Sequence, residues 1–367
     1  MAVFDQVYNY FESNELFHQN HHGFRKHHST VTAVQQLRDF WLKNADKGKL
    51  CSSILLDLSA GFDVIPKKLL LDKLRVYGFD KKCLAWFKSY LIDRSQCVQV
   101  ESKMSSLLEV PFGVPQGSQL SPLLFIIFIM ELPEVIKEDK TQTNSEDSEN
   151  DDGDINSEED DKADETVVIY ADDNTPNCSA DSIEELKEKT QEMAVRAVKW
   201  FTLNQMIVSA EKTKLLYMGS KKTIENKIPE DFNTSIKVDN KDVNHSNSEK
   251  LLGLIINESL TWNHHIYRDT ENKGLLRTLG QRIGILSKIR KFIKSPKKFL
   301  PYLNGLFSSS LHYGITAWGC VFGIPGQANI SRSAFPKKDI LRLQSLQNKA
   351  IRLLYQRDRL TPTKPTS

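Results

Sequence analysis

Two short apolar segments, each ending in acidic residues, constrain this chain more than any other feature of its sequence. The first runs into Asp57 within Leu-Asp-Leu-Ser-Ala-Gly-Phe-Asp, and the second, 115 positions later, runs into Asp172 and Asp173 within Ile-Tyr-Ala-Asp-Asp. Short apolar runs bounded by polar residues are typical of buried strands. Two such strands in one sheet would bring three carboxylates to one edge, where they repel each other unless divalent cations neutralise them. The pattern therefore predicts a cation site at the edge of a sheet.

The charge of the chain is distributed unevenly. Its net charge is only +2, yet residues 138–165 hold fourteen Asp and Glu against two Lys, so the other residues carry 47 basic against 33 acidic groups. A basic body points to a polyanionic partner, and nucleic acid is the obvious one. The acidic stretch has few apolar residues, so residues 137–165 are predicted to be a disordered insertion. We expect it either to be inert or to compete with nucleic acid for the basic body.

Cysteine usage and hydropathy indicate the compartment. The five cysteines are scattered, odd in number and never spaced as Cys-x-x-Cys, which argues against a disulfide framework or a zinc finger and favours a reducing compartment. No apolar stretch reaches the length of a membrane span, and the N-terminus lacks a signal-peptide pattern. We therefore expect no membrane partner and a location in the cytoplasm and nucleus. Five histidines between His18 and His28 suggest a metal site less strongly than they suggest a polar loop before a helix.

Hydrophobic periodicity predicts a mixture of helices and strands. Helices are expected over 1–17, 31–42, 66–76, 83–91, 122–132 and 182–201, and the chain from about Trp262 onward reads as helical and basic. Strands are expected over 52–58, 166–170, 214–217 and 251–256, with a hairpin formed by 96–100 and 107–111.

A third motif lies between the two acidic segments. Residues 112–118 read Phe-Gly-Val-Pro-Gln-Gly-Ser and are followed by Leu-Ser-Pro-Leu. In this order the three segments resemble the palm of a reverse transcriptase. The resemblance is closest to the enzymes of non-LTR retrotransposons (LINE elements), particularly the jockey-like group.

The resemblance implies an α/β (α+β) fold shaped as a right-hand polymerase, with a palm whose antiparallel sheet packs on helices. It divides the chain into partial fingers, two parts of the palm separated by the acidic insertion, and a helical thumb with a C-terminal tail. The ranges are 1–50 for the partial fingers, 51–136 for the first part of the palm and 137–165 for the acidic insertion. The second part of the palm, 166–261, carries the catalytic hairpin and the primer grip, since Leu251-Leu252-Gly253 resembles the primer-grip hairpin. The thumb and tail take 262–367. Compared with the family pattern, we expect this sequence to lack the first fingers segment and the endonuclease domain of the full-length element.

The same resemblance assigns the acidic residues. It implies that Asp57 and Asp172 are the principal ligands of Mg²⁺ (Mn²⁺ is also possible) and that Asp173 is the auxiliary carboxylate in two-metal nucleotidyl transfer. Each of these aspartates taken alone would read as a solvated strand end. Asp63, in the same segment as Asp57, is expected to fix the turn before Pro66 and not to bind metal.

Five further residues match family positions. Phe62 is expected to block a ribose 2′-hydroxyl, and Lys212 is expected to act as a general acid or electrostatic stabiliser at the pyrophosphate. Arg25 resembles a residue that approaches the incoming triphosphate. Gln116 and Gly117 are expected beside the templating base pair. Without the family resemblance, Phe62 would be interpreted as a core aromatic residue, and Lys212 and Arg25 as solvated cations.

The resulting hypothesis is an RNA-directed DNA polymerase that extends a DNA primer on an RNA template with deoxynucleoside triphosphates. The alternative is a catalytically inactive, truncated nucleic-acid-binding relic of such an element. A third possibility is an interaction protein whose acidic tract recruits basic partners.

Overall fold

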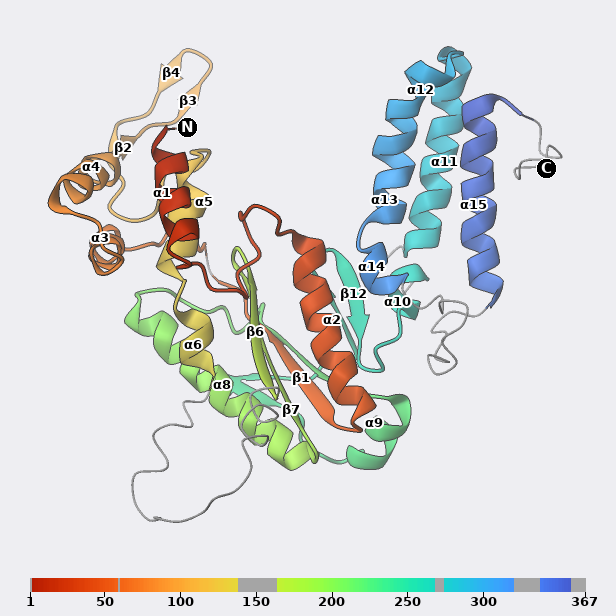
Figure 1. The fold of residues 1–367 in the computed structure, drawn as a ribbon, viewed down its shortest axis with the longest axis horizontal. Helices are drawn as coiled ribbons and strands as arrows, with labels where there is room; N and C mark the ends of the chain where they lie inside the picture. The colour runs from red at the N-terminus through yellow and green to blue at the C-terminus, as the bar shows by residue number, and fades with distance from the viewer. Residues whose placement is uncertain (1, 59, 138–163, 268–273, 320–336, 358–367) are drawn as a thin grey trace. The chain divides into compact units, whose positions relative to one another are not determined.

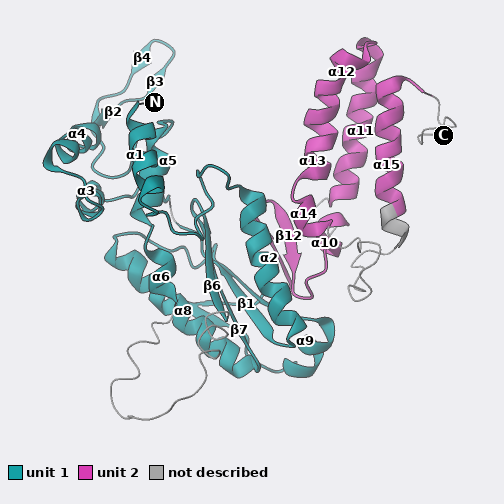
Figure 2. Cartoon of the chain, viewed as in Figure 1, with its two compact units in different colours: residues 1–246 teal, residues 247–367 magenta. Residues whose placement is uncertain are grey.

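The computed structural model describes residues 2–58, 60–137, 164–267, 274–319 and 337–357 (Figure 1). The chain divides into two compact units, residues 1–246 and 247–367 (Figure 2). Apart from Lys137, Asp164 and Glu165, the predicted acidic insertion lies outside the described residues.

The first unit is built on a four-stranded antiparallel sheet in the order β6-β7-β1-β8. The strands are β1 (Leu50–Leu55), β6 (Glu165–Tyr170), β7 (Asp173–Ala180) and β8 (Lys214–Met218). β1 is central, since Cys51 is opposite Ser179 on one side and Met218 on the other. The antiparallel palm sheet predicted from the sequence is thereby confirmed.

Helices α2 (Thr30–Asp46) and α8 (Ile183–Leu203) cover opposite faces of this sheet (Figure 1). Trp41 on α2 donates its indole N–H to Ser53 Oγ at 3.0 Å, whereas Thr190 on α8 donates to Ser52 Oγ at 2.7 Å. Neighbouring residues of a strand point to opposite faces. The first unit is therefore a sheet between two helical layers.

Serine side chains cap the starts of α2 and α8. Ser29 caps α2 and forms a reciprocal capping box with Thr32, and the Ser182 hydroxyl accepts the Glu185 N–H at 3.2 Å at the start of α8. Such caps satisfy backbone N–H groups that have no partner inside the helix.

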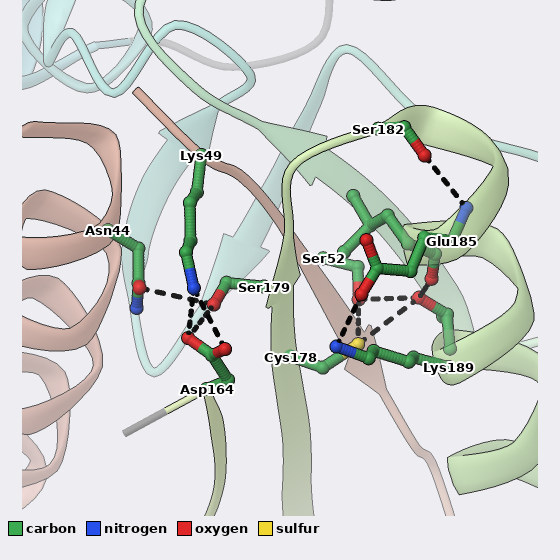
Figure 3. Close-up of polar contacts among 11 residues, drawn as sticks. Asn44, Lys49, Ser52, Asp164, Cys178, Ser179, Ser182, Glu185 and Lys189 are labelled. Atoms are coloured by element: carbon green, nitrogen blue, oxygen red, sulfur yellow. Dashed lines mark hydrogen bonds and ion pairs between the residues drawn. The ribbon is translucent and has the colours of Figure 1, made fainter. Parts of the chain in front are cut away.

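The beginning of β6 is fixed by the last residues of the acidic segment. Nζ of Lys49 lies 2.8 Å from both carboxylate oxygens of Asp164, and the Ser179 hydroxyl donates to Asp164 Oδ1 at 2.9 Å (Figure 3). Burial raises the pKa of Asp164, but Lys49 and Ser179 together outweigh it and leave the pKa below its ordinary value. β6 thus starts at Glu165, one residue before the predicted Thr166.

The first unit also contains the apolar α5 (Leu120–Phe128), every residue of which except Pro122 is buried, and five further helices among the described residues. They are α1 (Ala2–Ser13), α3 (Lys67–Val76), α4 (Lys81–Leu91), α6 (Leu132–Ile136) and α9 (Lys221–Lys227). A two-stranded sheet of β9 (Ile236–Val238) and β10 (Lys241–Val243) completes the unit.

The helical spacing of Leu69, Leu70, Leu74 and Val76 predicts an apolar inner face for α3, and this prediction is wrong for Val76. Val76 is 84% exposed, while Lys73 is buried beside Leu70 and Leu74. Its ammonium is tolerated there because it donates to the carbonyl of Phe128 at 2.8 Å and to Glu131 at 2.7 Å.

The predicted hairpin after α4 is present but short and exposed. β2 (Ser95–Gln96) pairs with β5 (Leu108–Glu109), and β3 (Gln99–Val100) pairs with β4 (Lys103–Met104).

The histidine-rich loop was predicted to be a polar loop, but two of its histidines are buried. His21 and His22 are buried because the loop adds to the edge of β6, where the His22 N–H donates to the carbonyl of Ile169 at 2.8 Å. The His22 ring lies within hydrogen-bond distance of Thr32 and Gln36, which satisfies its polar atoms.

The second unit begins with a hairpin where a single strand was predicted over 251–256. β11 (Ser248–Leu251) and β12 (Leu254–Asn257) pair across a turn at Leu252 and Gly253, which have φ of 46° and 83°. The single strand is wrong because hydrophobic periodicity does not show a two-residue turn inside an apolar run, whereas the hairpin implied by the resemblance of residues 251–253 is present. The helices that follow confirm the predicted helical region. They are α10 (Asn263–Ile266), α11 (Leu275–Phe292), α12 (Pro296–Leu303), a π-helical turn (Asn304–Ser308), α13 (Ser309–His312), α14 (Ile315–Trp318) and α15 (Lys337–Tyr355). None of the described helices combines the length and apolarity needed to span a membrane.

Candidate active site

The tight turn between β6 and β7 carries two of the predicted aspartates. Tyr170 pairs with Asp173, so Ala171 and Asp172 form a two-residue turn, with Ala171 at a φ of 57°. The buried side chain of Asn174 donates to the carbonyl of Asp172 at 2.8 Å and steadies the turn. Asp172 and Asp173 themselves are exposed.

Asp57 lies at the same end of the sheet. Its neighbour Leu56 donates its N–H to the carbonyl of Asn174 at 2.9 Å, which places Asp57 next to the turn that carries Asp172 and Asp173. One oxygen of its half-buried carboxylate, Oδ1, is buried without a hydrogen-bond partner. The structure therefore brings the three predicted aspartates to one edge, as the sequence indicated.

Mutual repulsion is visible in the electrostatics of Asp173. Its pKa is raised to about 6, first because the surrounding protein removes part of the hydration of its carboxylate and then because of the negative charges of Asp172 and Asp57. Asp173 as a whole residue is nevertheless exposed, so the cost of its ionisation is moderated by solvent. A bound cation would instead lower the pKa of Asp173, because positive charge favours the ionised carboxylate.

The donor set fits a divalent cation. Three carboxylates with one unpartnered oxygen match the all-oxygen coordination that Mg²⁺ prefers. Within the described ranges, no three His, Cys, Asp or Glu side chains are drawn together as a ready coordination shell. Carboxylates that repel each other are not expected to converge without a cation.

Lys212 is brought to the same cluster. Its Nζ lies 3.7 Å from Oδ1 of Asp57, on a turn in which the N–H groups of Lys212 and Thr213 both donate to the carbonyl of Ser209. The Lys212 side chain is 68% exposed, so the ion pair is weak and its ammonium stays available to another anion.

Phe62 packs in an aromatic group beside the cluster. Its ring stacks on Phe125 with centroids 4.5 Å apart and meets Phe24 edge-on at 6.2 Å. Gly61 makes room for this packing, since a Cβ there would lie 3.2 Å from the Phe125 ring. Phe62 is only partly buried, so it is both a packing residue and open to a ligand.

Gln116 and Gly117 occupy an exposed turn. The Ser118 N–H donates to the carbonyl of Pro115 at 3.3 Å, and Gly117 has a φ of +77° at the third position, as glycine commonly does in a type II turn. Nε2 of Gln116 donates to Oδ1 of Asp63 at 2.7 Å, a partner that sequence reasoning missed. The backbone turns at Asp63, whose N–H donates to the carbonyl of Ala60 at 2.8 Å.

Arg25 holds the histidine-rich loop. Its guanidinium donates to the carbonyls of His18 at 2.8 Å and His21 at 3.2 Å and lies over the ring of Phe17. These contacts are structural, and its contact with a triphosphate remains a prediction.

A model of the family described as "Reverse transcriptase (RNA-dependent DNA polymerase)" matches residues 2–256. The chain therefore belongs to the reverse transcriptase family. It is similar to proteins of Drosophila mobile elements of the jockey-like kind.

The "Probable RNA-directed DNA polymerase from transposon X-element" of Drosophila melanogaster is 23% identical over 346 residues, which cover 94% of this chain and 32% of that protein. The "RNA-directed DNA polymerase from mobile element jockey" of the same species is 24% identical over 320 residues, covering 87% and 31%. The chain thus spans about a third of the length of these relatives.

One solved structure supports the fold. Apo telomerase from Candida tropicalis matches 97% of this chain and 49% of its own, with a TM-score of 0.50 and 13% sequence identity. At this identity the likeness shows the fold alone, which is that of a right-hand polymerase.

Proposed function

We propose that this chain is the RNA-directed DNA polymerase of a jockey-like LINE element and that it extends a DNA primer on an RNA template. The observation that supports this most is the meeting of Asp57, Asp172 and Asp173 at one edge of the palm sheet. The unpartnered Oδ1 of Asp57 adds to it, because a buried orphan oxygen calls for a cation.

In this proposal Asp57, Asp172 and Asp173 hold Mg²⁺, with Mn²⁺ as a substitute. The cation supplies charge that lowers the pKa of the primer 3′-hydroxyl and stabilises the departing pyrophosphate. Lys212 lies close enough to Asp57 to place a second positive charge at the same phosphates and to donate a proton to the leaving group.

The other matched residues select and hold the deoxynucleoside triphosphate. Phe62, stacked on Phe125, has little freedom to move and would exclude a ribose 2′-hydroxyl. Gln116 and Gly117 would lie against the templating base pair, because their turn is exposed and glycine permits close approach. Arg25 would approach the triphosphate with the part of its guanidinium that the His18 and His21 carbonyls leave free.

The second unit would bind the primer–template duplex. Exposed cations along α11, the turn after it and the start of α12 suit phosphate contacts that do not depend on sequence. They are Arg277, Lys288, Lys291, Lys294, Lys297 and Lys298. Arg282 and Arg290 of the same stretch are instead used inside the unit, since Arg282 donates to the carbonyl of Leu306 and Arg290 to that of Leu353.

The domain assignment follows from the same proposal. Residues 1–50 act as partial fingers, 51–136 and 166–261 as palm, and 262–367 as thumb and tail. The full-length element would add an endonuclease domain, and the protein would work in the cytoplasm and nucleus, where RNA and target DNA are found.

Primer extension on an RNA template with deoxynucleotides and Mg²⁺ tests the proposal. Extension that stops when the RNA template is omitted is the expected result. Binding of primer–template without extension, at any tested Mg²⁺ or Mn²⁺ concentration, would favour the inactive alternative.

A further inference from the structure

A side-chain hydrogen bond joins the two loops that border the proposed nucleotide site. Nε2 of Gln116 donates to Oδ1 of Asp63 at 2.7 Å, although the two residues are 53 positions apart. Both residues are exposed, so the bond adds little to folding stability. It does connect the residue proposed to face the templating base pair with the loop that carries Phe62.

The backbones of these loops are also paired. The Gly113 N–H donates to the carbonyl of Ile65 at 2.9 Å, and the Val114 N–H donates to that of Phe62 at 3.1 Å. Gly113 has a φ of +79°, and a Cβ there would lie 2.7 Å from the backbone oxygen of Asp63. Only glycine permits so close an approach. The backbone of Asp63 is therefore held in place next to the turn that carries Gln116.

The chemistry of the pair fixes the orientation of the Gln116 amide. The two ends of an amide have nearly the same shape, but one donates and the other accepts hydrogen bonds. A carboxylate only accepts, so Asp63 takes the NH₂ end and excludes the flipped amide. The carbonyl oxygen and the second N–H of Gln116 are then left in a defined arrangement for a ligand.

The surroundings suit a nucleic-acid strand. Asp63 and Gln116 line a groove of about 730 Å³ together with Lys67, Arg94 and Phe112, whose side chain is 51% exposed. Arg94 is exposed and can meet a phosphate, whereas Lys67 is buried and donates to the carbonyl of Val110. A cation and an exposed aromatic ring on which a base can stack are the usual components of such a groove.

We propose that Asp63 is a positioning residue for nucleotide selection. It holds the Gln116 amide in one orientation and links it to the Phe62 loop, so that the fit of the base pair and the fit of the sugar depend on each other. The inference rests on the proposed function and assigns no metal ligation to Asp63.

Asp63→Asn is the sharpest test, because asparagine keeps the shape and the hydrogen bond but can accept or donate. We expect an unchanged melting temperature and a nearly unchanged kcat for the correct deoxynucleotide. Misincorporation and ribonucleotide use should both rise roughly 3- to 10-fold, because the hydrogen bond no longer fixes one orientation of the Gln116 amide. Asp63→Ala should give the same direction of change, and Asp39→Asn, an exposed aspartate on α2, is the matched control.

A measurement independent of catalysis separates the inference from the proposed function. In the NMR spectrum of the full chain, the side-chain NH₂ signals of Gln116 should shift in Asp63→Asn and stay in place in Asp39→Asn. If the parent extends primers but Asp63→Asn is as selective as the parent, the inference is wrong and the proposed function stands. The same holds if the Gln116 NH₂ signals do not shift in Asp63→Asn. If the parent binds primer–template but never extends it, the proposed function is wrong. The hydrogen bond between Asp63 and Gln116 then has no role in nucleotide selection.

Discussion

The ammonium of Lys212 lies 3.7 Å from Oδ1 of Asp57, a carboxylate oxygen that is otherwise buried without a hydrogen-bond partner. The chain thus places one of its own cations beside one carboxylate of the aspartate cluster. In the proposed polymerase, the Lys212 ammonium contacts Asp57 in the free protein and the phosphates of the nucleotide once it is bound.

Replacement of Lys212 by Met should therefore slow chemistry more than binding. We expect kcat for nucleotide addition to fall about 10- to 100-fold, with a smaller change in KM for the deoxynucleotide, because the charge acts on the leaving group. Single-turnover extension measures this. Lys221→Met is the control, since Lys221 is an 82% exposed lysine paired with Glu225. Equal losses in the two variants would contradict the assignment of Lys212.

Phe62→Val should relax sugar selection. The smaller side chain no longer fills the space under the sugar, so the ratio of ribonucleotide to deoxynucleotide incorporation should rise at least about tenfold. Loss of the stack on Phe125 should also lower stability by about 1 kcal/mol. Phe79→Val, which disturbs the aromatic contacts with Phe11 and Phe87, controls for stability. An unchanged ratio in Phe62→Val would show that Phe62 is only a packing residue.

Asp173→Asn should stabilise the protein when divalent cations are absent. The raised pKa of Asp173 means that its ionised form is disfavoured in the folded state at neutral pH. Removing that charge should raise the free energy of unfolding by about 1 kcal/mol, a figure reduced for the exposure of the residue. Thermal melts in chelator and in Mn²⁺ check this: Mn²⁺ should raise the melting temperature of the parent more than that of the variant. A variant less stable than the parent in chelator would contradict the account.

The pair of Lys49 and Asp164 gives a stability effect with a defined pH dependence. The pKa of Asp164 is lowered in the folded state, so its ionised form stabilises the fold above the ordinary carboxyl pKa. That contribution should be lost as pH falls below about 4. Asp164→Asn should accordingly be less stable than the parent at pH 7, and the difference should shrink at pH 3. Asp181→Asn, whose carboxylate lies 3.9 Å from Lys227 and is 76% exposed, should show almost no difference at either pH. A gap of constant size would mean that Asp164 acts by packing alone.

The positions of the three aspartates were predictable because each lies just after an apolar strand. An apolar run that ends in Asp57, and another that ends in Asp172 and Asp173, must expose those carboxylates where the strands end. Family resemblance then placed Lys212, and the structure brings it to Asp57. Strand order, by contrast, was not predicted, since nothing in the two runs says that β1 is central.

What sequence reasoning missed depends on contacts between distant segments. No local pattern pairs Asp63 with Gln116 or Lys73 with Glu131, because each pair is more than fifty positions apart. The buried histidines were misjudged for the same reason, as the edge of β6 that receives them is far along the chain. Hydrophobic periodicity missed the hairpin turn at Leu252 and Gly253 because apolar residues lie on both sides, and the family resemblance alone predicted a hairpin there. Gly253 was its one local signal.

The central claim is that the three aspartates form the metal site of a polymerase. The most direct measurement compares the parent with Asp172→Asn in primer extension on an RNA template with deoxynucleotides and Mg²⁺. The account predicts extension by the parent, a loss of about a thousandfold or more in Asp172→Asn, and similar duplex binding by both. Extension by Asp172→Asn at the rate of the parent would contradict it.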